Sequence, residues 1–206
     1  MAKTPVKVCG ICRFDDAARA VECGASAIGF IFWPGSQRCI EPEQAREIAA
    51  RLPPHVTAIG VFVDQPIEFV EAVAAAVPLG AIQLHGGESV QAFARVSQPL
   101  IKAIAVTEGF DTSSVDAVPA AVTVLLDAHD PIRRGGTGRT IDWAVAATVS
   151  RQRPIILSGG LTAANVGDAI ARVRPHMLDV SSGVESAPGR KDAGKLREFF
   201  AAVAAA

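Results

Sequence analysis

The sequence predicts an α/β protein with the (β/α)₈ barrel fold, in which eight parallel strands alternate with helices. Three observations predict it. Eight short runs rich in β-branched residues recur along the 206-residue chain, helix-like segments lie between them, and the glycine-rich loops come after the sixth, seventh and eighth runs. Most runs are apolar throughout, as expected of parallel strands that are covered on both faces. Strands alternating with helices on this scale match a compact barrel.

The predicted strands follow from these runs in chain order. They are VKVCG (6–10), AIGFIF (27–32), TAIGVFV (57–63), GAIQLHG (80–86), LIKAIAV (100–106), VTVLLDA (122–128), PIILSGG (154–160) and MLDVSSG (177–183). Several end in glycine or a small polar residue, which is typical of a strand that leads into a functional loop.

The predicted helices lie between the runs and have apolar residues at three- and four-residue spacing. They are FDDAARAVECG (14–24), EPEQAREIAARLP (41–53), PIEFVEAVAAAV (66–77), SVQAFARVS (89–97), IDWAVAATVSR (141–151), AANVGDAIARV (163–173) and KLREFFAAVAAA (195–206). The first begins with acidic residues and stops at a glycine, and the second has a proline in its first turn. For VTEGFDTSSVDAVP (106–119) we expect only a short helical turn.

An open, doubly wound sheet is the main alternative fold. Such a sheet usually has fewer strands and often carries a phosphate-binding glycine loop after its first strand. Here the glycine-rich loops come late in the chain, which favours the barrel. No linker, low-complexity segment or block of charge divides the sequence, so we expect one barrel domain over residues 1–206.

Composition excludes several classes of partner. The net charge is -1 and no Lys/Arg run stands out, which argues against a broad nucleic-acid surface. No apolar run reaches the length of a membrane span, and the N-terminus lacks the apolar core of a signal peptide. The cysteines, Cys9, Cys12, Cys23 and Cys39, all lie in the first fifth of the chain. This clustering is unlike a secreted disulfide scaffold, so we expect free thiols in the cytoplasm.

Catalytic groups of a barrel lie at the carboxyl ends of its strands. The polar residues predicted there are Cys9, Arg38, Asp64, Gln83, His85, Lys102, Asp127, Ser158, Asp179, Ser181 and Ser182. They come from separate parts of the chain, and closure of the barrel would gather them around one opening. For His85 we expect a structural hydrogen-bonding role more than a catalytic one, and for Asp179 a supporting position near the opening.

Two late loops predict a phosphate site. SGGLTAANV (158–166) and SSGVESAPGRKD (181–192) each put glycine between a strand and the segment that follows. Glycine lets backbone N–H groups approach an anion closely, and barrels commonly hold phosphate in the loops after strands seven and eight. The alternative is that both are ordinary tight turns. A third loop, GGTGRTIDW (135–143), is a candidate lid over the same ligand.

Cys9 has several possible roles. With Cys12 it forms a C-x-x-C pair, which suits a dithiol oxidoreductase; a zinc site would need two more ligands; and a buried structural cysteine is the plainest alternative. Asp127 favours a catalytic role, because the first and sixth strands face each other across a barrel. A thiol and a carboxyl group on opposite sides of a small ligand suit a general base and a general acid. Lys7 and Lys102 carry the charge that would favour a thiolate, and the sequence does not choose between them.

The motifs KVCGI, FIFWPGSQR, GVFVD, QLHGGE, IKAI, LLDA, GGTGRTIDW, SGGL and LDVSSGVESAPGRKD occur in this order. Together they resemble those of the phosphoribosylanthranilate isomerases of tryptophan biosynthesis, from about residue 6 to the C-terminal helix. The resemblance implies a (β/α)₈ barrel that uses neither a metal nor an organic cofactor. It implies the Amadori rearrangement of N-(5-phosphoribosyl)anthranilate, a phosphosugar, to 1-(2-carboxyphenylamino)-1-deoxyribulose 5-phosphate.

The resemblance also implies roles for residues. Cys9, in KVCGI, would be the general base, and Asp127, in LLDA, the general acid. Arg38 would contact the anthranilate carboxylate. The phosphate would be held largely by backbone amides around Gly159, Gly160, Ser182 and Gly183. Because the family includes monomers and dimers, the chain is expected to be a monomer or a homodimer.

Other functions stay open at this point. One is another phosphosugar barrel, such as a lyase or an indole-ring-forming synthase, although a synthase would be expected to use lysine and glutamate. Another is a non-catalytic phosphate-binding barrel, which would not need Cys9 opposite Asp127. A dithiol oxidoreductase would need Cys12 as much as Cys9. The sequence also leaves open activity on the related aminoaldose phosphate of histidine biosynthesis.

Overall fold

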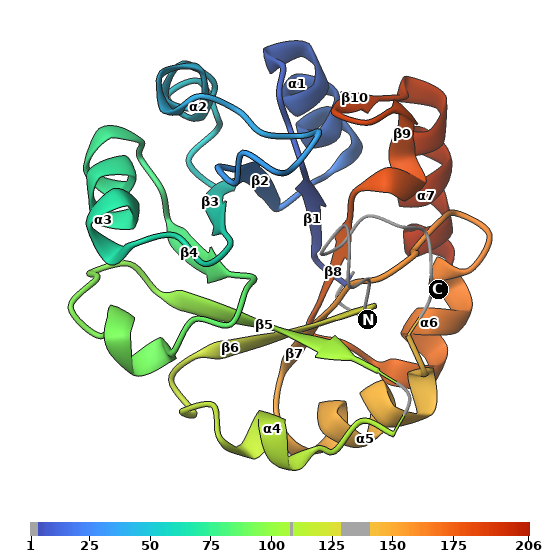
Figure 1. Cartoon of the computed structure of the whole chain (residues 1–206). Coiled ribbons are helices and arrows are strands. Elements are labelled where there is room, and N and C mark those ends of the chain that lie inside the picture. The colour runs from blue at the N-terminus through green and yellow to red at the C-terminus, as the bar shows by residue number, and fades with distance from the viewer. Residues whose placement is uncertain (1–3, 108, 129–140) are drawn as a thin grey trace.

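The computed structural model describes residues 4–107, 109–128 and 141–206, and it contains a closed barrel of eight parallel strands (Figure 1). The strands are β1 (Val6–Cys9), β2 (Ala27–Ile31), β3 (Thr57–Phe62), β4 (Ala81–Leu84), β5 (Leu100–Val106), β6 (Thr123–Ala128), β7 (Ile155–Leu157) and β8 (Met177–Val180). Each pairs with the next, and β8 pairs with β1 to close the ring. The predicted fold class is confirmed.

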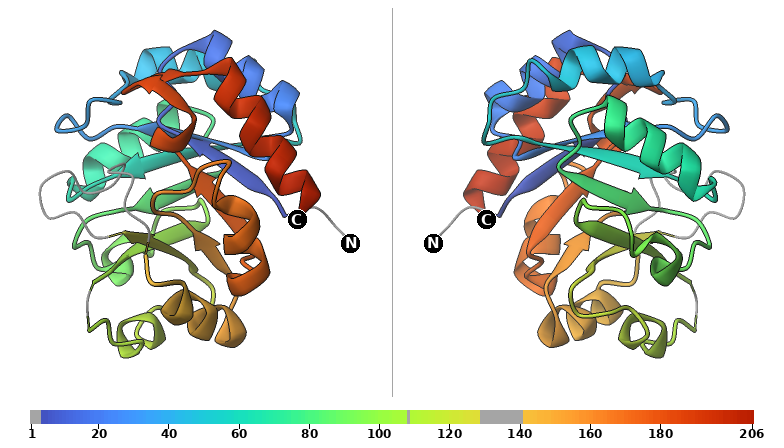
Figure 2. Two further views of the ribbon diagram at one scale, coloured as in Figure 1. Left: turned by 90° about the vertical axis from the view of Figure 1, so that its right-hand side faces the viewer. Right: turned by 90° about the vertical axis from the view of Figure 1, so that its left-hand side faces the viewer.

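Helices cover the outside of the barrel (Figures 1 and 2). They are α1 (Phe14–Cys23), α2 (Pro42–Ala49), α3 (Ile67–Ala76), α4 (Ser113–Asp116), α5 (Trp143–Gln152), α6 (Val166–Val173) and α7 (Ala193–Ala205). Two helix ends form as the sequence predicted. Gly24 ends α1 in the left-handed conformation, and Pro42 lies in the first turn of α2. None of the helices in the described part of the chain is long and apolar enough to cross a membrane.

Three predicted helices are shorter than the sequence pattern indicated. Helix α2 ends at Ala49 instead of residue 53, because Arg51 and Leu52 donate to carbonyls three residues back and the chain leaves the α-helix in a tighter turn. In 89–97 only a 3₁₀ helix, η1 (Val90–Phe93), forms, since its two buried residues are spaced by three and support a single turn. Helix α6 begins at Val166 instead of residue 163. Asn165 is the reason: its side chain accepts from the N–H of Thr162 and donates to the carbonyl of Gly160, which holds these residues in a turn.

The segment after β8 holds structure that the sequence pattern did not predict. A short 3₁₀ helix, η2 (Ser182–Val184), leads into an antiparallel hairpin of β9 (Glu185–Ala187) and β10 (Arg190–Lys191). The turn of this hairpin uses Gly189, whose φ is 74°. This segment was expected to be a glycine-rich loop, and it carries two charged side chains that matter for the site.

The barrel interior has two layers. Side chains of a strand alternate between faces, so Leu125 lies on the same face of β6 as Asp127, and Ala81 on the same face of β4 as Gln83. The layer nearer the strand starts is an apolar cluster of Ala27, Ile59, Ala81, Ile101, Ala103, Leu125 and Ile156. We call it the apolar layer. Above it, toward the carboxyl ends of the strands, the same faces carry polar groups.

Candidate active site

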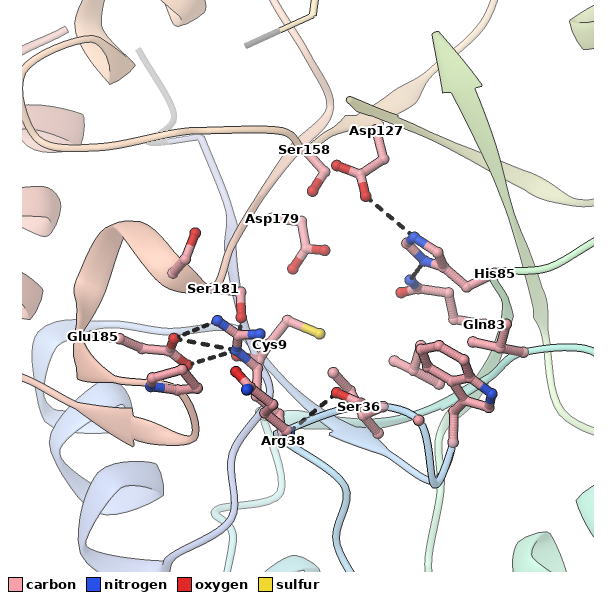
Figure 3. Close-up of a pocket in the computed structure, with 18 of the residues that line it drawn as sticks. Cys9, Ser36, Arg38, Gln83, His85, Asp127, Ser158, Asp179, Ser181 and Glu185 are labelled. Carbon is pink, nitrogen blue, oxygen red and sulfur yellow. Dashed lines mark hydrogen bonds and ion pairs between the residues drawn. The ribbon is translucent and has the colours of Figure 1, made fainter. Parts of the chain in front are cut away.

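A cavity of about 540 Å³ opens at the carboxyl ends of the barrel strands (Figure 3). It is lined by most of the residues that the sequence placed there, namely Cys9, Arg38, Gln83, His85, Asp127, Ser158, Asp179, Ser181 and Ser182. One wall is apolar and includes Ile31, Trp33, Val61 and Val63. The cavity therefore combines apolar side chains, one of them the indole of Trp33, with many polar ones, which suits a ligand that has one aromatic and one hydroxylated part.

Asp64 and Lys102 were predicted at the opening but do not line the cavity. The Asp64 carboxylate accepts from the N–H of Gly87 at 2.6 Å. Lys102 donates to the carbonyl of Gly86 at 2.7 Å and to Glu88 at 3.1 Å. Both side chains therefore brace the loop after β4, which follows the strand end that carries His85.

Cys9 ends strand β1 and is only 6% exposed. Its sulfur points into the cavity (Figure 3). Burial raises the pKa of this thiol, while the ammonium group of Lys7 beside it acts in the opposite direction. All four cysteines are free, and the described residues contain no cluster of His, Cys, Asp and Glu that could hold a metal ion.

Asp127 lies near the end of β6, across the cavity from Cys9 (Figure 3). One carboxyl oxygen accepts from the N–H of Ala128 at 2.9 Å, and the other lies 3.2 Å from Nε2 of His85. The other ring nitrogen of His85 lies 2.8 Å from the amide nitrogen of Gln83. A chain of three side chains, Gln83 of β4, His85 just after it and Asp127 of β6, thus fixes the direction of the carboxyl group. His85 makes hydrogen-bonding contacts, and its structural role stays a prediction.

Arg38 lies in the loop after β2, and Glu185 of β9 holds its guanidinium group. Arg38 Nε lies 3.0 and 3.1 Å from the two carboxylate oxygens, and Nη2 lies 2.7 Å from one of them. Nη1 donates to no described residue. Lys191 of β10 donates to the same carboxylate at 2.7 Å. Sequence reasoning missed Glu185 and Lys191 because their segment was taken for a loop; two opposite charges six residues apart in that loop were the available signal.

The two loops predicted to bind phosphate are packed against each other. A Cβ atom at Gly183 would overlap the carbonyl oxygen of Leu161, so only glycine allows the loop after β8 to approach the loop after β7 this closely. Gly159 and Gly160 have φ values of 91° and 62°. Ser158, Ser181 and Ser182 line the cavity. Gly159, Gly160 and Gly183 are not among the lining residues; they lie one or two positions after Ser158 and Ser182 in the chain.

The backbone donors of these loops are uncommitted. The N–H groups of Gly159, Gly160, Ser182 and Gly183 donate to no acceptor among the described residues. Adjacent backbone donors of this kind form a concave site for an anion. The predicted lid, 135–143, lies mostly outside the described residues, which resume at Ile141.

The fold and the cavity define the class: a (β/α)₈-barrel enzyme whose active site lies at the carboxyl ends of the strands. The family follows from comparison with known proteins. Residues 6–202 match the family model described as N-(5'phosphoribosyl)anthranilate (PRA) isomerase. The chain belongs to this family, and the resemblance seen in its motifs is confirmed.

Individual relatives agree. An N-(5'-phosphoribosyl)anthranilate isomerase of Geobacter metallireducens is 47% identical over 197 residues, which cover 95% of this chain and 96% of the relative. The phosphoribosyl anthranilate isomerase structure from Thermotoga maritima superposes with a TM-score of 0.90 at 39% identity, covering 98% of this chain and all of the other. A further isomerase structure holds reduced 1-(o-carboxyphenylamino)-1-deoxyribulose 5-phosphate; its TM-score is 0.87 at 38% identity, with the same coverage.

Proposed function

We propose that this chain is a phosphoribosylanthranilate isomerase of tryptophan biosynthesis. It converts N-(5-phosphoribosyl)anthranilate to 1-(2-carboxyphenylamino)-1-deoxyribulose 5-phosphate by general acid–base catalysis. The observation that carries the proposal is that a thiol on β1 and a carboxyl group on β6 project into one cavity from opposite sides (Figure 3). Family membership supports the same reaction.

In the first step Asp127 acts as the general acid. Its protonated carboxyl group gives a proton to the ring oxygen of the furanose as the bond between that oxygen and C1 breaks. The nitrogen lone pair moves to C1, and the product is an open-chain sugar with a protonated C=N bond. The contact with His85 and the N–H of Ala128 hold the carboxyl group in a fixed direction during this step.

In the second step Cys9 acts as the general base. Its thiolate removes the proton from C2, the electron pair forms a C1=C2 double bond, and the nitrogen becomes neutral. The enolamine then loses its C2 hydroxyl proton and gains a proton at C1, which gives the ketone. After the first two transfers Asp127 is a carboxylate and Cys9 is a neutral thiol. The carboxylate can accept the C2 hydroxyl proton and the thiol can give its proton to C1, which returns both groups to their starting states. Each positioned group contributes roughly 10²–10⁴-fold to the rate.

The remaining residues bind the substrate. We assign the anthranilate ring to the apolar wall of Ile31, Trp33 and Val61, and its carboxylate to Nη1 of Arg38. The 5-phosphate is assigned to the backbone N–H groups of Gly159, Gly160, Ser182 and Gly183, whose loops adjoin the cavity at Ser158 and Ser182. A related isomerase binds a reduced form of the same phosphosugar product, which supports a substrate of this class.

The steps above are proton transfers, so they require neither a metal ion nor an organic cofactor. Three expectations from the sequence stay predictions. They are that residues 1–206 form one barrel domain, that the protein is cytoplasmic, and that it is a monomer or a homodimer.

A fluorescence assay tests the proposal. Phosphoribosylanthranilate is made in situ, and its consumption is followed without added metal or nucleotide. Wild type should consume it, while Cys9→Ala and Asp127→Asn should keep the thermal unfolding midpoint and bind the reduced product yet lose roughly 10²–10⁴-fold in kcat. The matched control is Cys12→Ser, which should be nearly silent here and inactive in a dithiol oxidoreductase. A wild-type rate in Asp127→Asn would contradict the assigned acid.

A further inference from the structure

A buried lysine lies directly beneath the proposed base. Lys7 and Cys9 are two residues apart on β1, so both side chains point into the barrel. Lys7 is 0% exposed. An ideal Cβ atom on Gly29, the β2 partner of Cys9, would lie 2.8 Å from the Cys9 sulfur and 3.1 Å from Cε of Lys7. The end of the lysine side chain and the sulfur therefore occupy the space above the same glycine.

Lys7 is held in place by one carboxylate. Its ammonium nitrogen lies 3.0 Å from Asp179 on β8, the strand that closes the barrel against β1. Asp179 accepts one hydrogen bond from the ammonium group, which also interacts with the Cys9 sulfur beside it. Burial by itself would lower the pKa of Lys7, but Asp179 and Cys9 together raise it above its ordinary value, so the lysine stays charged.

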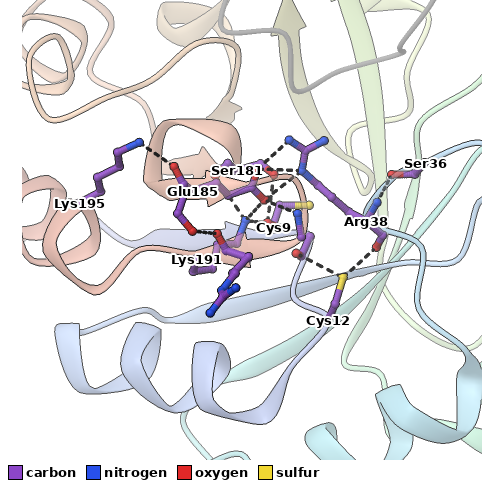
Figure 4. Close-up of polar contacts among 12 residues, drawn as sticks. Cys9, Cys12, Ser36, Arg38, Ser181, Glu185, Lys191 and Lys195 are labelled. Atoms are coloured by element: carbon purple, nitrogen blue, oxygen red, sulfur yellow. Dashed lines mark hydrogen bonds and ion pairs between the residues drawn. The ribbon is translucent and has the colours of Figure 1, made fainter.

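A second group of charged side chains contacts the backbone of Cys9 (Figure 4). Lys191 donates to the backbone carbonyl of Cys9 at 2.6 Å and to Glu185 at 2.7 Å. Arg38 completes this group through its paired contact with Glu185. Lys191 and Glu185 are buried, so bulk water screens these charges weakly.

The charges of this cluster do not cancel when Cys9 is a neutral thiol. The groups that face it are Lys7 (β1), Arg38 (loop after β2), Asp179 (β8), Glu185 (β9) and Lys191 (β10). Three basic side chains oppose two carboxylates, which leaves one positive charge when all three are protonated; burial lowers the pKa of Lys191, and Glu185 acts against that lowering. A thiolate at Cys9 balances that positive charge. The Asp127–His85 pair faces this cluster only across the cavity.

We propose that Lys7, held by Asp179, is a positioning residue that stabilises the thiolate form of Cys9. The catalytic meaning of this rests on the proposed function. The structure also chooses between the two lysines that the sequence left open, because the end of Lys7 lies beside the Cys9 sulfur, whereas Lys102 donates to Gly86 and Glu88 in the loop after β4. Burial raises the pKa of the Cys9 thiol, and the nearby Asp179 carboxylate also raises it, whereas Lys7 and Lys191 lower it. Removing Lys7 and removing Asp179 should therefore shift the thiol pKa in opposite directions.

The test removes each charge in turn. In a background where Cys12, Cys23 and Cys39 are serine, thiolate absorbance near 240 nm is followed against pH, and alkylation by iodoacetamide is timed at neutral pH. Lys7→Met should slow alkylation roughly tenfold and move the titration to higher pH, and Asp179→Asn should do the reverse by a similar factor, as for about one unit of pKa. Lys7→Arg should stay near the parent, and Lys102→Met is the matched control without effect.

The double variant keeps the test decisive if Lys7→Met alone fails to fold. Lys7→Met with Asp179→Asn removes one charge of each sign, leaves no buried charge unpaired, and should restore the titration to near that of the parent. Single variants that shift the thiol in the same direction, or leave it unmoved, would overturn the proposal. In the active enzyme, the pH at which kcat rises should shift with the thiol in each variant while KM changes little. If the thiol responds as expected but wild type does not consume phosphoribosylanthranilate, the proposed function fails instead.

Discussion

The two layers of the barrel interior are built from the same strands but do different work. The apolar layer packs small and branched side chains such as Ala81 and Leu125, which have no polar atoms to satisfy. Two residues further along the same strands lie Gln83 and Asp127, which face the cavity. One step of the strand repeat therefore separates a group that stabilises the fold from a group that we assign to chemistry. The comparison teaches that on β4 and β6 the change from an apolar to a polar side chain takes one step of the strand repeat, whereas on β1 the charged Lys7 reaches down to the level of Ala27.

The largest expected effect on stability lies in the apolar layer. Leu125→Ala removes a fully buried side chain and should lower the free energy of unfolding by about 2–5 kcal/mol through lost burial and a residual cavity. Urea unfolding monitored by circular dichroism measures it. At a temperature where the variant is folded, kcat should stay within about twofold of wild type; a loss as large as that of Asp127→Asn would break the division between the layers.

At His85 we expect a smaller effect, and one on kcat instead of on stability. His85→Asn should lower kcat about tenfold, because the Asp127 carboxyl group loses a partner worth about 1.4 kcal/mol while the barrel stays packed. Steady-state kinetics measure kcat, and a thermal melt of the same preparation measures the unfolding midpoint, which should not change. The matched control is His176→Asn, at a position outside the cavity. An unchanged kcat in His85→Asn would show that the carboxyl group is held by its backbone contact alone.

The smallest effect concerns acid stability at the edge of the polar layer. Arg38 and Lys191 hold the pKa of Glu185 below its usual value against the effect of burial. The folded protein then binds fewer protons at this site than the unfolded chain, so stability is present above the ordinary glutamate pKa and falls as the pH drops through the lowered one. Glu185→Gln should flatten the decline of the unfolding free energy below about pH 4.5. If the unfolding free energy of Glu185→Gln declined as steeply as that of wild type, Glu185 would not contribute to the acid sensitivity.

The strands and most helices followed from the sequence because each was encoded locally. A buried parallel strand needs a short apolar run, and a helix such as Phe14–Cys23 needs a repeating face and a terminal glycine. The three helices whose lengths were misjudged depended on side-chain hydrogen bonds for α6, on a single turn of burial for η1, and on a tighter last turn for α2. None of these features has a periodic pattern in the sequence.

Candidate site residues were predictable where a strand ends at the cavity, as for Cys9 and Asp127, which both line it. Glu185 and Lys191 were not, because their importance lies in reaching Arg38 and Cys9 across the fold and not in their local sequence. The same holds for Lys7, whose charge was noted but whose direction depended on the register of β1 with β2 and β8.

The contact between β1 and β8 has a consequence for how activity appears during biosynthesis. Lys7 and Asp179 are 172 positions apart, and Cys9 and Lys191 are 182 apart. A ribosome that has released most of the chain has therefore made Cys9, Lys7 and Arg38, but not Asp179, Glu185 and Lys191, which complete the group of charges around the thiol. Catalytic competence should arrive last, together with the C-terminal strand, so that a nascent or truncated chain carries an inert sulfur until the ring is complete.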